Sequence, residues 1–416
     1  MSPTRRDIAV IGAGPAGAAT AIRAARGGAH VTVFEKASPG RDKVCGDGLT
    51  PRAVAALNEL GIELDGAHRI DGLRMIAGAT RRELLWPANN RFGPHGAVWP
   101  RRALDKHLIE AAQAAGAEIA WNTEVMPVLS DDGTVVGVES AAGGKRFLAD
   151  MVVLATGAPG SAARLLGAER VESEPFGLAI RTYAPSPRHA DRHLEACLTL
   201  RGAEGGWVPG YGWMFPAGDG TVNIGAGSMS TMKGFRKLNL NRLLSDYRDL
   251  VAWEWELGDF LERPRAWRLP MSVGRRHGRG WAAVGDAAGL INPMNGEGID
   301  YGLESGMLLA DLFLAGPAAA PDAYDRIIGE RFDGFLRTGR RFSFLIGHPW
   351  ILRNGLRMAV GTQAVANITL QVMGNLVDGD TPGLAPRVLD VVDGGLRLAD
   401  PLLRRTRAPA AASRRM

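Results

Sequence analysis

The sequence predicts an α/β protein in which a parallel sheet is followed by an antiparallel sheet and a helical C-terminal region. Three observations indicate this arrangement. Residues 7–34 read as an apolar strand, an alanine-rich helix and a second apolar strand, which is a βαβ unit. Residues 169–267 alternate apolar and polar side chains between glycine turns, as antiparallel strands do. From residue 321 onward the pattern is mostly helical.

The composition is that of an enzyme-sized globular protein. The chain has 416 residues, 46% of them hydrophobic and 22% charged, which is enough for a large core in two or three domains. Its 55 glycines and 24 prolines form no low-complexity runs, so collagen and disorder are excluded. The two cysteines, Cys45 and Cys197, cannot make a disulfide framework or, by themselves, a zinc or iron–sulfur site. Because no secretory signal precedes the first strand, we expect a cytoplasmic protein.

The turn between the first strand (7–11) and its helix (16–26) contains Gly12, Gly14 and Gly17, and Glu35 ends the second strand (29–34). Gly12 permits a sharp turn, Gly14 lets backbone amides approach a pyrophosphate, and Gly17 lets helix and strand pack closely. Glu35 can accept ribose hydroxyls, while the helix N-terminus supplies a positive field. The pattern predicts a dinucleotide-binding domain of the Rossmann type. The alternative is a tight βα turn without a ligand.

The first domain continues with a helix at residues 104–115 and strand-like segments at 118–121, 125–129, 135–140 and 151–154. We expect the parallel sheet to resume there. In the second domain, residues 217–220 have the composition of a hairpin turn joining strands 211–215 and 221–226, and a helix at 238–250 closes the domain. Tyr211, Trp213 and Phe215 alternate along the first of these strands and therefore share one face. They form either a ligand wall or part of the domain core.

A second glycine-rich segment follows at residues 282–298, with a strand, a Gly285-Asp286 turn, a loop and a helix starting near Asn295. Asp286 can hold ribityl or pyrophosphate-side hydroxyls. The glycine-flanked helix start can direct N–H groups at the N1–C2=O edge of a flavin, where reduced flavin is negatively charged. Together with the first glycine turn, this segment identifies the dinucleotide as FAD. The alternative is an Asn-capped helix preceded by a turn.

Residues 358–377 are the longest stretch without charge, but six polar side chains within it argue against a membrane span. Val365, Ile368, Val372 and Leu376 fall on one side of an amphipathic helix, which faces either the core or a lipid interface.

The formal net charge is +5, and cations concentrate near the C-terminus at Arg404, Arg405, Arg407, Arg414 and Arg415. These cations suit an anionic membrane surface, whereas no nucleic-acid-binding motif accompanies them. A solvated tail is the other interpretation.

Several segments together resemble the geranylgeranyl reductase family. They are the glycine fingerprint, RDKVCGDGL (41–49), Arg101-x-x-Leu104-Asp105, VGDAA (284–288) and NGEGIDYG (295–302). The likeness covers nearly the whole chain. Within the family, CGDGLTPR (45–52), GYGWMFP (210–216) and NGEGIDY (295–301) are most similar to the actinobacterial menaquinone reductases, which saturate an isoprene unit of the menaquinone tail.

The resemblance implies an FAD-dependent oxidoreductase that reduces C=C bonds of a prenyl lipid or quinone. It implies that Cys45 lies close to the isoalloxazine, and Cys45 and Tyr211 are the candidate catalytic residues, Tyr211 as proton donor or orienter. It places Arg101 near the FAD phosphates and Tyr211, Trp213 and Phe215 along a prenyl tunnel. The expected cofactor-binding residues are Gly12, Gly14, Gly17, Glu35, Lys36, Cys45, Gly46, Arg101, Gly285, Asp286, Pro293, Gly296, Gly298 and Ile299.

We expect a discontinuous FAD-binding domain at residues 1–74, 98–168 and 266–320. The substrate domain then comprises residues 75–97 and 169–265, and a C-terminal helical region with a basic tail comprises residues 321–416.

Thr156-Gly157 stands where relatives commonly carry Asp-Gly at a flavin and nicotinamide contact. Either NAD(P)H or a small redox protein is therefore the expected electron donor. His189 and His193 lack the glutamate of a metalloprotease motif, and we expect no metal site.

Two other flavin chemistries share this scaffold. The GYGWMFP block also resembles a halogenase block, but no lysine occurs between Lys43 and Lys106, where those halogenases need a catalytic one. Aromatic hydroxylation remains open, because a fold alone does not fix chemistry. A flavin-holding partner protein without turnover is a third interpretation.

Overall fold

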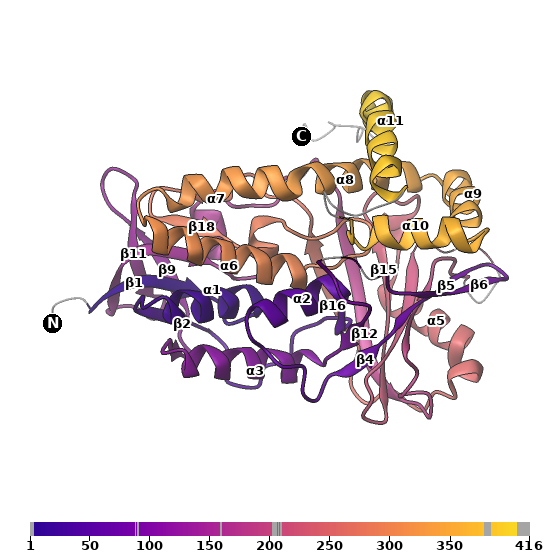
Figure 1. The fold of residues 1–416 in the computed structure, drawn as a ribbon, viewed down its shortest axis with the longest axis horizontal. Coiled ribbons are helices and arrows are strands. Elements are labelled where there is room, and N and C mark those ends of the chain that lie inside the picture. The colour runs from indigo at the N-terminus through magenta and orange to yellow at the C-terminus, as the bar shows by residue number, and fades with distance from the viewer. Residues whose placement is uncertain are drawn as a thin grey trace, which may run out of the picture.

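The computed structural model describes residues 4–87, 89, 91–158, 160–201, 206, 208, 210–377 and 384–405. Figure 1 shows the sheet of the first domain on one side, the second sheet on the other, and the C-terminal helices across the top. The α/β class predicted from the sequence, with a parallel sheet, an antiparallel sheet and C-terminal helices, is confirmed.

The first sheet has the described strand order β17-β18-β11-β1-β2-β8, and β10 and β9 join it beside β11. β1 pairs in parallel with β2 and β11, and β11 pairs in parallel with β18. Its strands are β1 (Thr4–Ile11), β2 (Val31–Phe34), β8 (Glu118–Ala120), β9 (Val125–Leu129), β10 (Val135–Ser140), β11 (Arg146–Leu154), β17 (His277–Gly278) and β18 (Trp281–Ala283).

One part of the sheet departs from the expectation. β9, β10 and β11 form an antiparallel meander instead of continuing the parallel order. The physical reason is the length of their connections, because residues 130–134 and 141–145 are enough for hairpin turns but far too few for a parallel crossover.

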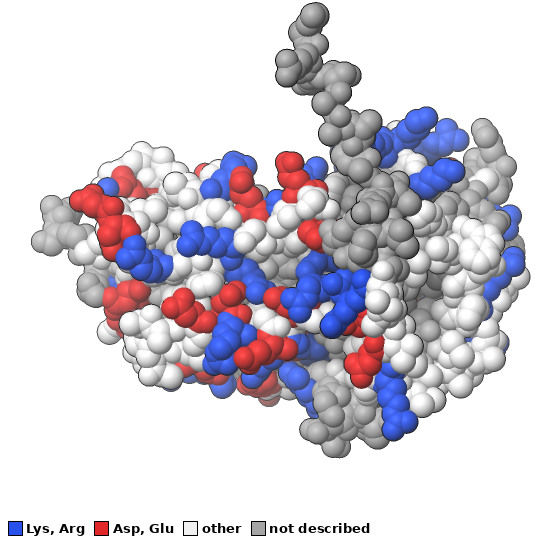
Figure 2. Space-filling model, turned by 90° about the horizontal axis from the view of Figure 1, so that it is seen from above, with Lys and Arg blue, Asp and Glu red and all other residues white. Residues whose placement is uncertain are grey.

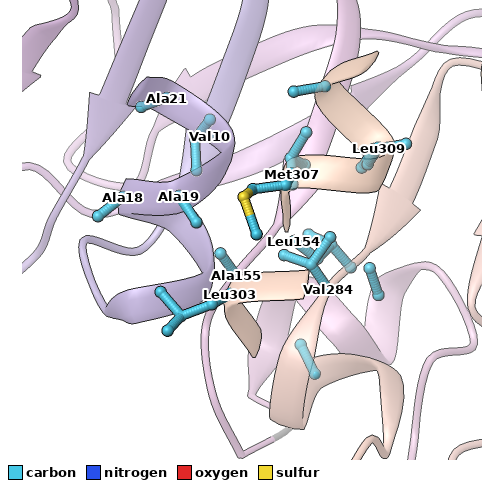
Figure 3. Close-up of a cluster of buried hydrophobic side chains, with 14 of the residues drawn as sticks. Val10, Ala18, Ala19, Ala21, Leu154, Ala155, Val284, Leu303, Met307 and Leu309 are labelled. Atoms are coloured by element: carbon cyan, nitrogen blue, oxygen red, sulfur yellow. The ribbon is translucent and has the colours of Figure 1, made fainter. Parts of the chain in front are cut away.

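Helices cover the first sheet, and among them α1 (Pro15–Arg26) packs along α6 (Ile299–Ala315). Small residues allow this approach, since a Cβ added to Gly306 would lie 2.5 Å from the Ala16 carbonyl oxygen. Figure 3 shows the core at this contact, with Met307 of α6 extending toward Ala19 of α1 above Leu154 and Val284. The other helices of this part are α2 (Pro51–Glu59), α3 (Arg101–Ala114), α4 (Ser161–Leu165) and α7 (Ala320–Ile328).

The second sheet has the strand order β16-β12-β15-β14-β13-β5-β6 and is antiparallel except between β13 and β5. The predicted hairpin is present, with β14 and β15 joined through residues 217–220. Helix α5 (Leu240–Trp255) covers one face through Tyr247 and Trp255. The strands are β5 (Gly72–Ala77), β6 (Thr80–Leu85), β12 (Phe176–Pro185), β13 (His193–Cys197), β14 (Tyr211–Pro216), β15 (Thr221–Met229) and β16 (Arg265–Pro270).

A small sheet of β3 (Gly48–Leu49), β7 (Gly96–Val98) and β4 (His68–Ile70) connects the two larger ones. Short 3-10 turns lie at η1 (Phe235–Lys237) and η2 (Gly285–Ala288), and the π-helical turn η3 (Gly329–Asp333) follows α7.

The C-terminal helices are α8 (Gly334–Ile346), α9 (Pro349–Ala359), α10 (Gln363–Met373) and α11 (Ala385–Arg405). The uncharged stretch at 358–377 is divided between α9 and α10, because Thr362 caps α10 by accepting a hydrogen bond from the Val365 N–H. Of the predicted apolar side, Val365 is 42% exposed and Leu376 is buried, while Ala366 and Leu370 also face inward. Among the described residues, no helix is long and apolar enough to cross a membrane. Arg407, Arg414 and Arg415 of the predicted basic tail lie outside the described residues.

Candidate functional site

The glycine turn after β1 has the close approaches that the sequence predicts. Gly12 has a φ of 111°, and a Cβ there would lie 2.4 Å from the Ala155 carbonyl oxygen. A Cβ on Gly17 would lie 2.0 Å from the Gly12 carbonyl oxygen. Helix α1 begins after Gly14, and no side chain caps its first turn. Its N-terminal N–H groups are therefore free to bind a phosphate.

Glu35 lies at the end of β2 and faces this turn. Its carboxylate accepts the Ala13 N–H at 2.9 Å and the Ala37 N–H at 3.0 Å. The carboxylate is thereby fixed beside the glycine turn, where the predicted ribose contact would be made. The neighbouring Lys36 is exposed.

Two arginines flank Gly14. A Cβ on Gly14 would lie 3.7 Å from one terminal nitrogen of Arg41 and 4.0 Å from one of Arg101. Arg101 is buried and donates to both oxygens of Asp105, at 2.7 and 2.8 Å. Burial alone would lower the pKa of Arg101, but the Asp105 carboxylate raises it overall, so the guanidinium stays charged. These cations would hold a pyrophosphate at the start of α1.

Lys43 is a site residue that sequence reasoning missed. Its ammonium lies 3.9 Å from the ring centroid of Trp267, and a Cβ on Gly157 would lie 3.1 Å from it. Burial lowers the pKa of Lys43 to about 8, with Asp286 opposing the shift and Arg101 adding to it. The available signal was its place in the RDKVCGDGL segment and the scarcity of lysine in the chain.

The second glycine-rich segment lies opposite the first. Asp286 follows β18, and a Cβ on Gly298 would lie 2.8 Å from its Oδ1. Burial raises the pKa of the Asp286 carboxyl. Helix α6 begins at Ile299 after Gly298, again with no side-chain cap. Gly296 has a φ of 81°, as the turn into this helix requires. Pro293 packs on α8, where a Cβ on Gly339 would lie 3.0 Å from its ring.

The segment from Cys45 to Gly48 lies against the aromatic residues of β14. A Cβ on either Gly46 or Gly48 would lie 3.0 Å from the Phe215 ring, so a larger residue at either position would require the ring to move. The Tyr211 and Trp213 rings are 5.7 Å apart, and those of Trp213 and Phe215 are 6.2 Å apart. The three predicted aromatic residues therefore form a continuous row beside the predicted cofactor contact at Cys45.

Asn223 of β15 fixes the row to this segment. Its side chain accepts the Trp213 indole N–H at 3.0 Å and donates to the Cys45 carbonyl oxygen at 2.9 Å. It also donates to the Asp47 carboxylate at 2.8 Å, which in turn accepts the Tyr183 hydroxyl at 2.5 Å. Sequence reasoning missed Asn223, Asp47 and Tyr183, because their contacts join distant segments.

Both candidate catalytic side chains are held in their neutral forms. Burial raises the pKa of the Cys45 thiol and raises that of Tyr211 to about 12. The Tyr211 hydroxyl reaches the second glycine-rich segment, since a Cβ on Gly296 would lie 3.4 Å from it. A neutral phenol at this place can donate a proton or a hydrogen bond.

Thr156 follows β11 beside the glycine turn, and its buried hydroxyl has no hydrogen-bond partner among the described residues. A buried hydroxyl without a partner is costly, and a bound ligand can supply one. The uncapped helix starts, the cations at Gly14 and this hydroxyl together fit a dinucleotide. Gly12, Gly14, Gly17, Glu35, Arg41 and Arg101 would hold its phosphate and ribose groups, and Cys45, Gly46, Asp286 and the start of α6 would border the flavin.

Fold and site together define a dinucleotide-binding α/β protein of the flavoprotein class. The family model described as an FAD binding domain matches residues 5–318. The chain belongs to this FAD-binding family, and within it to the group that includes the menaquinone and geranylgeranyl reductases. The family resemblance predicted from the sequence is confirmed.

Two relatives and one solved structure illustrate the likeness. The chain is 39% identical to a menaquinone reductase of Mycolicibacterium smegmatis, over 93% of this chain and 98% of that one. It is 32% identical to a digeranylgeranylglycerophospholipid reductase of Methanopyrus kandleri, over 74% and 80%. A geranylgeranyl bacteriochlorophyll reductase-like protein of Thermoplasma acidophilum shares the fold with a TM-score of 0.76 at 22% identity, covering 94% of this chain and all of that one.

Proposed function

We propose that this protein is an FAD-dependent reductase that saturates isoprenoid C=C bonds in a prenyl chain, which is the menaquinone tail or a geranylgeranyl lipid. The observation that carries the proposal is the aromatic row Tyr211, Trp213 and Phe215 lying against the glycine-lined segment at Cys45. The activities named for the relatives from Mycolicibacterium and Methanopyrus support it.

An isolated alkene needs a hydride at one carbon and a proton at the other, and no carbonyl activates it. FAD, when bound and reduced, supplies the hydride from its N5 position. The chain's own residues provide the rest. Trp213 and Phe215 form an apolar wall that excludes water and holds an extended chain, and Gly46 and Gly48 let this wall approach closely. Tyr211, kept neutral by burial, is the proposed proton donor or orienter.

The reductant of the cofactor is NAD(P)H or a small redox protein, as Thr156 in place of an acidic residue indicates. Mixing the oxidised holoprotein anaerobically with NADPH separates the two. Rapid bleaching of the flavin absorbance supports the nucleotide, and bleaching only with a reduced redox protein supports the partner.

We further propose that the protein works in the cytoplasm at the inner face of the cell membrane, because a prenyl lipid substrate resides in the bilayer. The arginines between residues 334 and 377, with no acidic residue among them, support this location.

The decisive experiment uses the purified yellow protein, reduced anaerobically and mixed with a panel of menaquinones and prenyl diphosphates. We expect flavin reoxidation and a product that has gained two hydrogens in its tail, detected by mass spectrometry. A product that contains added oxygen would instead identify a hydroxylase. A protein that stays colourless with added FAD would contradict the proposal.

Replacing Trp213 by alanine tests the apolar wall. We expect the turnover of a long-chain substrate to fall by about tenfold or more while the FAD content changes little, because the indole contacts the Cys45 segment and not the phosphate cradle. Turnover and flavin absorbance per protein are the measurements. Equal loss of both would assign Trp213 to the domain core, which its exposure of 5% also permits.

A further inference from the structure

The end of the molecule that carries α9 and α10 has large apolar side chains in solvent. Trp350 and Met358 of α9 are 69% and 74% exposed, and Leu85 at the end of β6 is 69% exposed. Trp350 and Met358 are eight residues apart, so they lie two turns apart on one face of α9, and the exposed Arg357 lies on this face as well. Val365 of α10 adds a fourth apolar side chain. We call Leu85, Trp350, Arg357, Met358 and Val365 the α9–β6 surface.

These residues belong to elements that are fixed to one another. Arg82 of β6 donates to the carbonyl oxygens of Val360 and Gly361 between α9 and α10, at 3.0 and 2.8 Å. The Gln363 amide of α10 donates to the Glu83 carbonyl oxygen at 3.0 Å. The edge strand of the second sheet is thus joined to the turn that connects the two helices. The exposed apolar side chains therefore belong to elements that are joined at this end of the molecule.

Positive charge predominates around this surface, and Glu83 of β6, which is 55% exposed, is paired with Arg74 at 2.9 Å. Residues 334–377 contain five arginines and no aspartate or glutamate. Figure 2, viewed from above, shows the right-hand end of the molecule as white residues with lysine and arginine around them, and no acidic residue there on the face shown. Tryptophan and arginine around exposed apolar side chains are typical of a surface that inserts shallowly into lipid headgroups.

A groove of about 440 Å³ opens at this surface between β6 and α10. Leu85 and Gln363 lie at its walls, and the buried side chains of Trp86 and Leu370 line it as well. Trp86 and Leu370 belong to a hydrophobic cluster against which Phe215 of the aromatic row packs. The groove is therefore separated from the proposed substrate wall by one apolar cluster, and its lining also includes the polar side chains of Glu83, Gln363, Asn367 and Gln371.

We propose that the α9–β6 surface docks on an anionic lipid bilayer and that the adjoining groove receives the prenyl tail from it. The inference rests on the proposed function, because only a substrate dissolved in a bilayer requires such docking. The excess of arginine in residues 334–377 favours anionic headgroups as the occupant.

The test uses the FAD-loaded, full-length protein and flotation with vesicles of phosphatidylglycerol and phosphatidylcholine. We expect the double variant Trp350→Ala/Met358→Ala to bind about tenfold more weakly, because it loses the apolar area that enters the bilayer. Arg357→Glu should weaken binding to anionic vesicles but not to pure phosphatidylcholine. Trp253→Ala is the matched control, since Trp253 is 94% exposed on α5, which covers the other face of the second sheet. It should bind as the unchanged protein does.

A second measurement separates this inference from the proposed function. Reduction of a short-chain menaquinone analogue in detergent micelles needs no bilayer, so the double variant should retain its rate there. If the unchanged protein reduces no prenyl substrate in micelles but still needs Trp350 and Met358 to float, the proposed function is wrong and the proposed lipid-docking surface is supported. Equal flotation of the double variant and the Trp253 control, or no flotation at all, overturns the surface. Light scattering tests whether a second copy of the chain occupies the surface. If the unchanged protein is a dimer and Trp350→Ala is a monomer, a second copy is the occupant and the lipid proposal is overturned.

Discussion

Asp47 adopts a φ of 64°, where residues other than glycine are uncommon, and its side chain is fully buried. Burial raises the pKa of its carboxyl, and the hydrogen bonds from Tyr183 and Asn223 oppose that shift. The Arg101 N–H also donates to it, at 3.1 Å. One side chain thus joins the Cys45 segment, the start of α3 and two strands of the second sheet. These hydrogen bonds offset a backbone strain on the order of 1 kcal/mol.

Lys43 gives the site a pH-dependent stability. Its pKa is lowered from its usual 10.5 to about 8, so the unfolded chain binds more protons between these two values. Folding stability must therefore rise with pH across this window. We expect the cofactor-free protein to gain stability relative to Lys43→Met as the pH rises from about 8 to about 10.5.

Urea unfolding of both proteins at several pH values measures this difference. Lys106→Met, at a largely exposed lysine of α3, is the control and should follow the unchanged protein. A difference between Lys43→Met and the unchanged protein that stays constant with pH would contradict the prediction.

The glycines and Glu35 of the first site segment were predictable because their roles depend on local backbone geometry within one βαβ unit. Lys43 and Asn223 were not predictable, because their partners are far away in the sequence. Lys43 contacts Trp267, and Asn223 contacts Cys45. A single sequence contains no signal for such pairs. The aromatic row was predicted as one face of a strand, but its contact with the Cys45 segment was seen only in the structure.

Helices α1 and α6 must approach closely for both uncapped N-termini to border one cofactor. Gly306 makes this possible, because a Cβ there would meet the Ala16 carbonyl oxygen at 2.5 Å and the Thr20 hydroxyl at 2.9 Å. We expect Gly306→Val to reduce the free energy of unfolding by about 2 kcal/mol or more and to weaken FAD binding, because the helices must separate.

Thermal unfolding and flavin titration measure the two effects. Gly316→Ala, at the end of the same helix where a Cβ would meet no atom within 4 Å, should change neither. Unaltered FAD affinity in the Gly306 variant would show that the spacing of the two helices does not set the cofactor site.

The sequence predicted the type of most elements and the pairing of β14 with β15, but not the pairing of β9, β10 and β11. The strands at 125–129 and 135–140 were recognised, while their antiparallel pairing depends on the lengths of their connections. Residues 358–377 have a helical pattern throughout, yet α9 ends at Ala359 and Thr362 caps the start of α10. Where such an apolar stretch breaks into two helices depends on what the helices pack against, and the hydrophobic pattern alone does not contain this information.

Arg52 connects three distant parts of the chain. From α2 it donates to both Glu304 oxygens of α6, at 2.6 and 3.1 Å, and to the Asn375 carbonyl oxygen after α10, at 3.0 Å. Burial raises the pKa of the nearby Asp300, and Glu297 adds to this, so Arg52 is the compensating charge of an acidic interior. We expect Arg52→Leu to cost about 3 to 5 kcal/mol, because buried carboxylates would lose their partner.

Chemical denaturation followed by circular dichroism checks this value. The exposed pair Arg326 and Glu330 offers the comparison, since Arg326→Leu should change stability by less than about 1 kcal/mol. Equal effects of the two substitutions would refute the role given to Arg52.

The contact between Gly306 and Ala16 joins two segments that the ribosome synthesises far apart in time. A ribosome completes β1 and the glycine turn early, but the strand β18 and the start of α6 that close the cradle emerge some 270 residues later. The nascent chain therefore exposes an open half-cradle during most of translation. A chain that stops before residue 299 would lack α6 and with it the side of the cradle that α6 would supply.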